Sequence, residues 1–145
     1  MTDKFFMRWM IAADMDWVSQ TEWMCFDDPM TRQEFTDILK RRNCIGLVAT
    51  LNDELAGYML YELMKEKYYM ITFAVHEDFR RRKVGTRMMD KMLAKFRPSR
   101  NRIEFEVRDD NLRGQLFLKK MGFRATGVTG DYYPMVREKV FLNYS

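Results

Sequence analysis

The sequence predicts a mixed α/β fold, organised as one domain over residues 1–145. Segments with the two-residue alternation of strands and segments with helical spacing follow one another along the chain. Three of the strands are consecutive and joined by short polar turns, which is typical of an antiparallel meander. A later strand, helix and strand should bring two strands side by side in parallel. Together these segments predict a mixed central sheet of about seven strands with about four helices.

The first part of the chain predicts one strand and two helices. Phe5–Met10 is rich in aromatic and apolar residues and is expected to be a short strand. A helix should follow over residues 14–24. Thr31-Arg32-Gln33-Glu34 fits a capping box, in which a threonine and a glutamate satisfy free N–H groups at a helix start. The apolar face of this second helix comes from Phe35, Ile38 and Leu39, and Asn43 ends it.

The predicted meander occupies the middle of the chain. Cys44–Leu51 and Leu55–Leu63 are two strands joined at Asn52-Asp53, a pair of residues that favours turns. The third strand, Tyr68–Val75, follows the polar turn Lys65-Glu66-Lys67. These three strands should therefore lie next to one another in the sheet.

The last part of the chain predicts two helices and three strands. Ile103, Phe105 and Val107 alternate as a strand, and Asn111–Met121 should be a helix with Gly122 as its C-cap. Closing strands are expected at Phe123–Val128 and Glu138–Tyr144, with Tyr132-Tyr133-Pro134 in the connection between them. The earlier helix of this part ends at Pro98 and has apolar residues at helical spacing, namely Val84, Met88, Met89, Met92, Leu93 and Phe96.

Composition excludes several classes of protein. The net charge of +4, from 25 basic and 21 acidic residues, is low for a dedicated nucleic-acid binder. No apolar run approaches the roughly 18–20 residues of a membrane-spanning helix. His76 is the only histidine, and Cys25 and Cys44 are the only cysteines, which leaves too few ligands for a His/Cys metal site. We therefore expect a cytoplasmic protein that holds no metal.

Four consecutive cations, Arg80-Arg81-Arg82-Lys83, stand between a predicted strand and a predicted helix, with Gly85 at the helix entry. The N–H groups of a first helical turn lack partners within the helix, and the macrodipole is positive there. Both features favour a phosphate, and the basic side chains add charge-assisted donors, so a pyrophosphate is a suitable ligand. The patterns GxxxxGK(S/T) and GxGxxG are absent, which excludes a Walker loop and a dinucleotide fingerprint. A solvated basic turn is the alternative.

Two segments together resemble the GNAT superfamily of acetyl-CoA-dependent N-acetyltransferases, and more narrowly the ribosomal-protein-alanine N-acetyltransferases (RimI-like). The loop Arg80–Gly85 is similar to the family pattern R/Q-x-x-G-x-G/A. Glu106-Val107-Arg108 and Asn111 match the family's E-V-R-x-x-N segment, and Gly122-Phe123 match the G-F that ends the next helix. Tyr132-Tyr133-Pro134 also resembles that subfamily. The resemblance covers most of the chain.

The resemblance implies an acetyl-CoA site in the cleft between two parallel strands that splay apart. The pantetheine amides are expected on the backbone of Phe73, Ala74 and Val75, and Asn111 is expected to reach the pantetheine arm. The pyrophosphate is expected on the basic loop, whose cofactor-binding residues would be Arg80, Arg81, Arg82, Lys83, Val84, Gly85 and Thr86. The phosphate argument from the residues and the resemblance point to the same loop.

Two residues depart from the family pattern. Lys83 stands where the family prefers glycine. A lysine that points outward can add a charge contact there, but a positive φ at this position would be strained. Leu118 stands where the family has a tyrosine that is thought to protonate the leaving thiolate, and leucine has no proton to donate.

Acetyl transfer needs a neutral amine, a polarised thioester carbonyl and a leaving thiolate. An α-amine has a pKa of about 7.7–8.0, so one carboxylate that acts directly or through a water is enough to deprotonate it. Glu106 is the predicted base because it falls in the family's register, whereas Glu104 on the same strand face does not. The alternative is that Glu106 pairs with an arginine such as Arg108. A backbone N–H near Val75 should polarise the carbonyl.

Tyr132 and Tyr133 are candidates for the remaining roles. Either tyrosine could serve as the acid, with Tyr132 named as the catalytic residue, and both are predicted to bind the first residues of the acceptor; packing on the closing strands is the alternative. A thiol pKa of about 8.5 lets the thiolate depart with little help, so Leu118 should slow the enzyme rather than inactivate it. Phe26-Asp27-Asp28-Pro29 is expected to help line the acceptor groove.

The predicted function is acetyl-CoA-dependent acetylation of an amine, favouring the N-terminal α-amine of a protein such as a ribosomal protein. A small-molecule amine acetyltransferase, a catalytically inactive family member that binds the cofactor, and a non-catalytic RNA-binding module are the alternatives. The expected partners are acetyl-CoA and a protein N-terminus or small amine. Neither a membrane nor nucleic acid is an expected partner, and the chain should be a monomer or a weak dimer.

Overall fold

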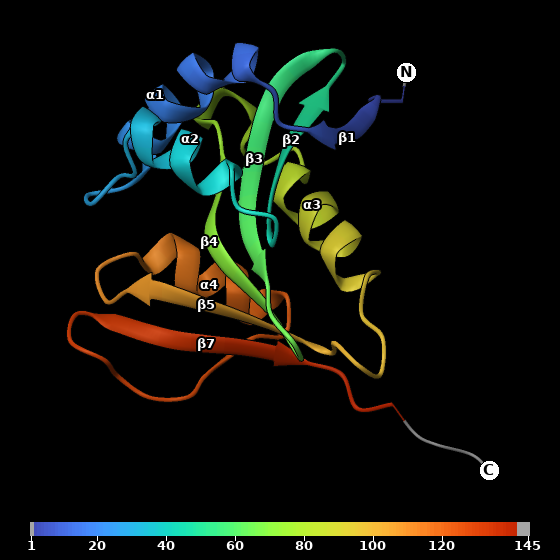
Figure 1. Ribbon diagram of the computed structural model, residues 1–145, viewed down its shortest axis with the longest axis vertical. Coiled ribbons are helices and arrows are strands. Elements are labelled where there is room, and N and C mark those ends of the chain that lie inside the picture. The colour runs from blue at the N-terminus through green and yellow to red at the C-terminus, as the bar shows by residue number, and fades with distance from the viewer. Residues whose placement is uncertain (1, 142–145) are drawn as a thin grey trace.

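The computed structural model describes residues 2–141, which build one seven-stranded sheet with helices against both of its faces (Figure 1). The strands are β1 (Phe5–Trp9), β2 (Cys44–Leu51), β3 (Glu54–Leu63), β4 (Tyr68–Val75), β5 (Arg102–Arg108), β6 (Arg124–Ala125) and β7 (Tyr132–Glu138). The helices are α1 (Met15–Cys25), α2 (Arg32–Leu39), α3 (Val84–Leu93) and α4 (Leu112–Lys120). Two short 3₁₀ turns, η1 (Ala12–Asp14) and η2 (Glu77–Phe79), precede α1 and the basic loop.

The strand order is β1-β2-β3-β4-β5-β7-β6, and every neighbouring pair is antiparallel except β4 and β5. The chain passes from β4 to β5 through α3, which is the connection that two parallel neighbours require. The predicted mixed α/β fold, the β2–β3–β4 meander and the parallel β4–β5 pair are therefore confirmed.

Two apolar cores hold the helices on the sheet. α3 and α4 cover one face, where Met88, Met89 and Met92 of α3 pack on the fully buried Met59 and Ile103. α1 and α2 cover the other face, where Val18 and Phe35 pack on Tyr58 and Leu60. The capping box that starts α2 is also confirmed, because the N–H of Glu34 donates to the Thr31 hydroxyl at 3.1 Å and the Thr31 N–H donates to the Glu34 carboxylate at 3.2 Å.

A β-bulge in β4 changes which face its side chains occupy. Tyr61 of β3 pairs with Met70, but the next residue, Leu60, pairs with Thr72, so Ile71 is an extra residue. One extra residue shifts the alternation of side chains between the two faces of a strand. Met70 therefore packs in the α3 core, whereas Thr72 turns toward α1.

The C-terminal part differs from the sequence prediction. The strand expected over Phe123–Val128 is only β6, two residues long, and Tyr132-Tyr133-Pro134 begins strand β7 instead of forming a connection. Residues 139–141 are not in a strand, and residues 142–144 of the predicted last strand lie outside the described residues. The Pro134 carbonyl accepts from the Thr126 N–H, on the side of β7 away from β5. Because the N–H and C=O of one strand residue point to the same side, the N–H that proline lacks would also have faced away from β5. Pro134 therefore removes no hydrogen bond between β7 and β5.

Candidate active site

The two parallel strands at the centre of the sheet separate soon after they meet. β4 and β5 pair only at Tyr68 with Ile103 and at Tyr69 with Glu104, and beyond these residues the strands diverge (Figure 1). Phe73 of β4 reaches the gap, where its ring centroid lies 6.0 Å from that of Phe105. Side chains thus bridge the strands where hydrogen bonds do not, and the edge of β4 that faces β5 keeps free backbone groups.

The basic loop has the backbone form of an anion-binding nest. Arg81 and Lys83 have positive φ angles of 64° and 63°, whereas Arg82 between them and Val84 after them do not. Alternation of this kind points successive N–H groups toward one concave spot that binds anions. The hydrogen bonds found within residues 2–141 leave the backbone N–H groups of residues 81–86 without an acceptor. The first turn of α3 also has no acidic residue, so its positive dipole is not compensated.

The side chains of the basic loop divide into two pairs. Arg80 turns back, with Nε donating to the Val75 carbonyl at 3.3 Å and a terminal nitrogen 3.5 Å from the Cys25 Sγ. Arg82 lies 3.5 Å from Asp3. Arg81 and Lys83 are exposed and have no ion pair within the described part of the chain. The second pair is therefore the one free to contact an anion held by the backbone.

The start of α3 fits closely under the end of β4. Val84 is buried, and a Cβ added at Gly85 would lie 3.3 Å from the Phe117 ring and 3.4 Å from Val75. Phe117 stacks on Phe73 with ring centroids 5.7 Å apart. Residues 73–75 and Gly85, predicted from the sequence to serve one ligand, are thus brought together at one end of the β4–β5 gap.

Asn111 begins α4 at the far side of this gap. Its side-chain oxygen accepts from the Gly114 N–H at 3.0 Å and caps the helix. This bond leaves the amide NH₂ as a donor. Asn111 therefore has a structural role that the sequence prediction did not include, and it keeps one group for a ligand.

Glu106 lies on the exposed face of β5 that looks toward α1 and α2, together with Glu104 and Arg108. Glu104 is paired with Lys67 and lies 4.0 Å from Arg102, and Arg108 is paired with Asp110 at 3.2 Å. No ion pair of Glu106 is found within residues 2–141, so the alternative of a Glu106–Arg108 pair does not occur. Glu106 is therefore a free carboxylate beside the point where the strands separate.

Tyr69 is a residue of this site that the sequence reasoning missed. It lies on β4 opposite Glu104, and burial raises the pKa of its hydroxyl, which the Glu106 and Glu104 carboxylates raise further. Tyr69 thus presents a protonated hydroxyl beside Glu106, as any tyrosine with an ordinary or raised pKa does at neutral pH. The signal in the sequence was weak, because only the bulge at Ile71 fixes which face each residue of β4 occupies.

The two predicted tyrosines of β7 point to opposite faces. Tyr132 pairs with Arg108, whose guanidinium carbon lies 5.8 Å from the centre of the Tyr132 ring, so it shares the Glu106 face. Tyr133 pairs with Val107 and packs against the α3 core. Leu118 is 3% exposed in that same core. Of the hydroxyls considered, those of Tyr69 and Tyr132 therefore lie on the face that carries Glu106.

The α1–α2 segment, residues 26–31, forms the wall opposite β5. Arg108 holds the pKa of the Asp110 carboxyl below its ordinary value, with a small further contribution from Asp27, which places Asp27 of the segment beside the β5–α4 loop. Glu22 anchors the segment from α1, because its carboxylate accepts from the Met30 N–H at 3.1 Å. That residues 26–29 line an acceptor groove stays a prediction.

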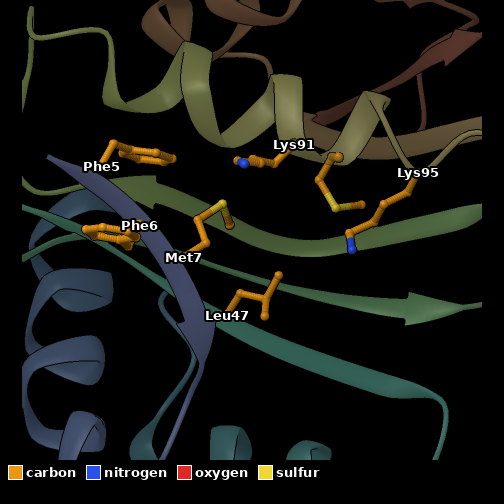
Figure 2. Close-up of a pocket in the computed structure, with 7 residues that line it drawn as sticks. Phe5, Phe6, Met7, Leu47, Lys91 and Lys95 are labelled. Atoms are coloured by element: carbon orange, nitrogen blue, oxygen red, sulfur yellow. The ribbon is translucent and has the colours of Figure 1, made fainter.

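Two surface hollows lie away from Glu106 and the basic loop. One, of about 310 Å³, opens between β1 and α3, and Figure 2 shows Phe5, Met7, Leu47, Lys91 and Lys95 around it. The other, of about 460 Å³, lies between the outer side of α1 and the start of α2. Pro29, Met30 and Thr31 of the α1–α2 segment line the second hollow, but Glu106 and the residues predicted to bind the cofactor line neither hollow. The candidate site is therefore the open gap between β4 and β5 and not an enclosed cavity.

No group of three or more His, Cys, Asp and Glu side chains among residues 2–141 is placed to hold a metal ion. None of the helices in that range is long and apolar enough to cross a membrane.

Comparison with known proteins gives consistent results. The model of the acetyltransferase (GNAT) family matches residues 11–123. A Bacillus subtilis (strain 168) protein, provisionally described as a [ribosomal protein bS18]-alanine N-acetyltransferase, is 27% identical over 136 residues, which are 92% of this chain and 89% of that protein.

Solved structures share the fold. Ard1 from Thermoplasma volcanium has a TM-score of 0.83 at 24% identity, with 94% of this chain and 99% of that chain covered. NAA60 from Arabidopsis thaliana, solved in complex with acetyl-CoA, has a TM-score of 0.79 at 15% identity, with coverage of 94% and 100%. At these identities, the similarity shows a shared arrangement of helices and strands.

Proposed function

The chain belongs to the acetyltransferase (GNAT) family, and on that premise we propose that it transfers the acetyl group of acetyl-CoA to the N-terminal α-amine of a protein. The observation that carries the proposal is the Glu106 carboxylate, free of any ion pair within the described residues, at the point where β4 and β5 separate, together with the nest at the start of α3. The provisional description of the Bacillus subtilis relative supports a protein N-terminus as the acceptor.

The residues present fit acetyl-CoA. The nest at residues 81–84 and the uncompensated start of α3 suit a pyrophosphate, and Arg81 and Lys83 would add charge to it. The free edge of β4 at Phe73–Val75 would hold the pantetheine amides, and the Asn111 amide remains as a further donor. When bound, acetyl-CoA supplies a thioester whose carbonyl carbon accepts the amine nitrogen while the carbon–sulfur bond breaks.

The chain's own groups would then handle the protons and the charge. Glu106 would take a proton from the incoming ammonium, either directly or through a water. A backbone N–H near Val75 would donate to the carbonyl oxygen as negative charge develops on it. Tyr132, or solvent, would return a proton to the departing sulfur. Tyr69, which keeps its proton at neutral pH, would orient the Glu106 carboxylate.

An α-amine suits this site better than a lysine side chain does. Its pKa is about 7.7–8.0, against about 10.4 for lysine, so a larger fraction is neutral at pH 7. One exposed carboxylate is then enough as a base. The wall of the α1–α2 segment, with Asp27 beside Asp110, also presents negative charge to an incoming ammonium.

A peptide panel tests the proposal. Purified protein and acetyl-CoA are incubated with peptides that begin with Ala, Ser, Met or Gly, with the same peptides blocked at the α-amine, and with free polyamines and amino acids. We expect acetylation of unblocked peptides alone, detected by mass spectrometry on the α-amine. Acetylation of free amines only would identify the small-molecule class instead, and cofactor binding without turnover would identify an inactive family member.

A further inference from the structure

Glu22 is a buried acid that the proposed chemistry does not use. It lies in α1 and is 3% exposed. One of its carboxylate oxygens accepts from the Tyr58 hydroxyl at 2.8 Å and from the Thr72 hydroxyl at 2.6 Å, and the other accepts from the Met30 N–H at 3.1 Å. A carboxylate is costly to bury unless it is hydrogen-bonded, and here three donors from three different parts of the chain meet it.

These three donors belong to the parts that surround the candidate site. Tyr58 is on β3, and Met30 is in the α1–α2 segment. Thr72 is on β4, directly before residues 73–75, which are predicted to bind the cofactor. The Phe26 N–H also donates to the Glu22 backbone carbonyl at 3.1 Å. Both ends of the turn from Phe26 to Met30 thus return to one residue, which fixes the turn on α1 and on the sheet together.

The turn that Glu22 fixes faces the site. Asp27 within it lies beside Asp110 at the end of β5, and Cys25 just before it contacts Arg80 of the basic loop. A displacement of this turn would therefore change the distance between the α1–α2 wall and the Glu106 face, and it would touch the basic loop only at Arg80, outside the nest at residues 81–84.

We propose that Glu22 is a positioning residue for the acceptor: by holding the α1–α2 segment against Thr72, it sets the width of the entrance through which an amine reaches Glu106. The inference rests on the proposed function, because it takes this entrance to be the route of the acceptor. It also predicts that acceptor binding and cofactor binding respond differently to a change at Glu22.

Asp14 provides a matched control. It is also an acid that is 3% exposed, it stands directly before α1, and it accepts hydrogen bonds from Arg8 at 2.8 and 2.9 Å and from the Ile11 N–H at 2.8 Å. None of its partners belongs to the α1–α2 segment or to β4. Asp14→Asn should therefore affect stability in the same way as Glu22→Gln, but not the acceptor entrance.

The experiment compares Glu22→Gln, Asp14→Asn and the wild type at a temperature well below every Tm. Because a hydrogen bond to a charged group is lost at the segment, we expect Glu22→Gln to raise the acceptor KM about tenfold or more. The Kd for acetyl-CoA, measured by calorimetry, should change less than about twofold in both variants, since the nest is untouched. Hydrogen exchange of residues 26–31 should accelerate in Glu22→Gln and stay unchanged in Asp14→Asn.

Three results would overturn the inference. They are an unchanged acceptor KM in Glu22→Gln, a rise in the acceptor KM of Asp14→Asn as large as that of Glu22→Gln, or a rise in the acetyl-CoA Kd of Glu22→Gln as large as the rise in its acceptor KM. If Glu22→Gln does not fold, Thr72→Val removes one donor and keeps the carboxylate, and it should raise the acceptor KM about threefold. If the wild type acetylates no peptide, the proposed acceptor fails, and the KM comparison is then made with the amine that the panel identifies. If the panel identifies no amine, the exchange of residues 26–31 and the acetyl-CoA Kd decide.

Discussion

The Glu106 carboxylate on β5 lies beside the Tyr69 hydroxyl on β4, at the point where these two parallel strands stop pairing. Each residue comes from a different side of the gap, and burial and the carboxylate both raise the pKa of the hydroxyl further above its ordinary value. The Glu106 carboxylate, which has no ion pair within residues 2–141, thus lies next to a hydroxyl donor on the neighbouring strand. This geometry suits a base that must keep one orientation while an amine approaches.

Replacing Glu106 with glutamine tests the base. We expect Glu106→Gln to lower kcat by about a hundredfold, within the range typical of general base catalysis, and to leave the acetyl-CoA Kd within about twofold. The loss should be largest below pH 7, where most α-amine is protonated and needs the base, and smaller above pH 8.5. Initial rates at saturating substrates from pH 6 to 9 measure this.

Glu104→Gln is the control for that substitution. Glu104 shares the strand face but is paired with Lys67, so its loss should change kcat less than about threefold. Equal rates for Glu106→Gln and the wild type across the whole pH range would remove Glu106 as the base.

Replacing Tyr132 with phenylalanine tests the acid. The phenylalanine keeps the ring under Arg108, so stability should change by less than about 0.5 kcal/mol, while kcat falls about tenfold to a hundredfold if the hydroxyl returns the proton. Tyr133→Phe serves as the comparison, because Tyr133 faces the core, and its kcat should stay unchanged. Full activity in Tyr132→Phe would mean that solvent protonates the thiolate.

Local patterns predicted much of the fold. β2 and β4 have the bounds expected from their apolar alternation, and the Thr31 capping box fixed the start of α2. From the sequence, Tyr132-Tyr133-Pro134 is expected in the connection between two strands, whereas the structure includes it in β7. The position of Pro134 in β7 depends on which neighbouring strand its missing N–H would have faced, and that is decided by the pairing with β5, which is distant in sequence, and by the contact with Thr126.

The candidate site was predictable only where its residues are close in sequence. The basic loop and Glu106 lie in short motifs, so sequence reasoning named them. Tyr69 and Glu22 have no such motif, because their roles depend on the bulge at Ile71 and on contacts between α1 and β4. Lys83 is a third case. From the sequence, a lysine here is strained only if its φ is positive, and the structure shows that it is.

Replacing Gly85 with glutamate tests the phosphate site. A side chain at Gly85 would press on Phe117 and Val75, and its charge would lie at the nest, so acetyl-CoA affinity should fall more than about a hundredfold. Gly127→Glu adds the same side chain where no atom lies within 4 Å, and its affinity should equal that of the wild type. Calorimetry measures both, and circular dichroism confirms that both fold.

A second variant keeps that test decisive. Arg81→Glu changes an exposed side chain at the nest without filling space in the core, and it should weaken acetyl-CoA binding about tenfold or more. Undiminished binding by both Gly85→Glu and Arg81→Glu would mean that the pyrophosphate does not bind at this loop.

Replacing Lys83 with glycine tests the strain at the start of α3. Lys83 has a φ of 63°, a conformation that costs a non-glycine residue about 1–2 kcal/mol, whereas glycine adopts it freely. The greater freedom of glycine in the unfolded chain offsets about 0.4–1 kcal/mol of this gain. We therefore expect Lys83→Gly to keep or raise the free energy of unfolding, by up to about 1 kcal/mol.

Arg82→Gly is the comparison variant, because its free energy of unfolding should change in the opposite direction. Arg82 lies between two positive-φ residues without a positive φ of its own, so glycine there relieves nothing and should destabilise by about 0.5–1 kcal/mol. Urea unfolding of both variants measures the difference. A lower stability for Lys83→Gly than for Arg82→Gly would show that the left-handed conformation at Lys83 carries no strain.

Replacing Asp14 with asparagine tests how the Arg8–Asp14 pair links stability to pH. The Arg8 hydrogen bond lowers the pKa of the Asp14 carboxyl below its ordinary value of 3.8, so the folded protein binds this proton less tightly than the unfolded chain does. The contribution of Asp14 to stability is therefore complete above about pH 5 and is lost as the pH falls below 3.8 toward the lowered folded pKa. We expect Asp14→Asn to be less stable than the wild type by about 1–3 kcal/mol at pH 7.

The gap between the two proteins should close as the pH falls from 5 to 2.5, because the wild type then loses the same charged interaction that the variant lacks. Urea unfolding at several pH values in this range measures the free energy of unfolding of each. Asp28→Asn, which changes an exposed carboxyl, should show no gap at any pH. A gap for Asp14→Asn that stays constant down to pH 2.5 would mean that the shape of the aspartate, and not its charge beside Arg8, stabilises the start of α1.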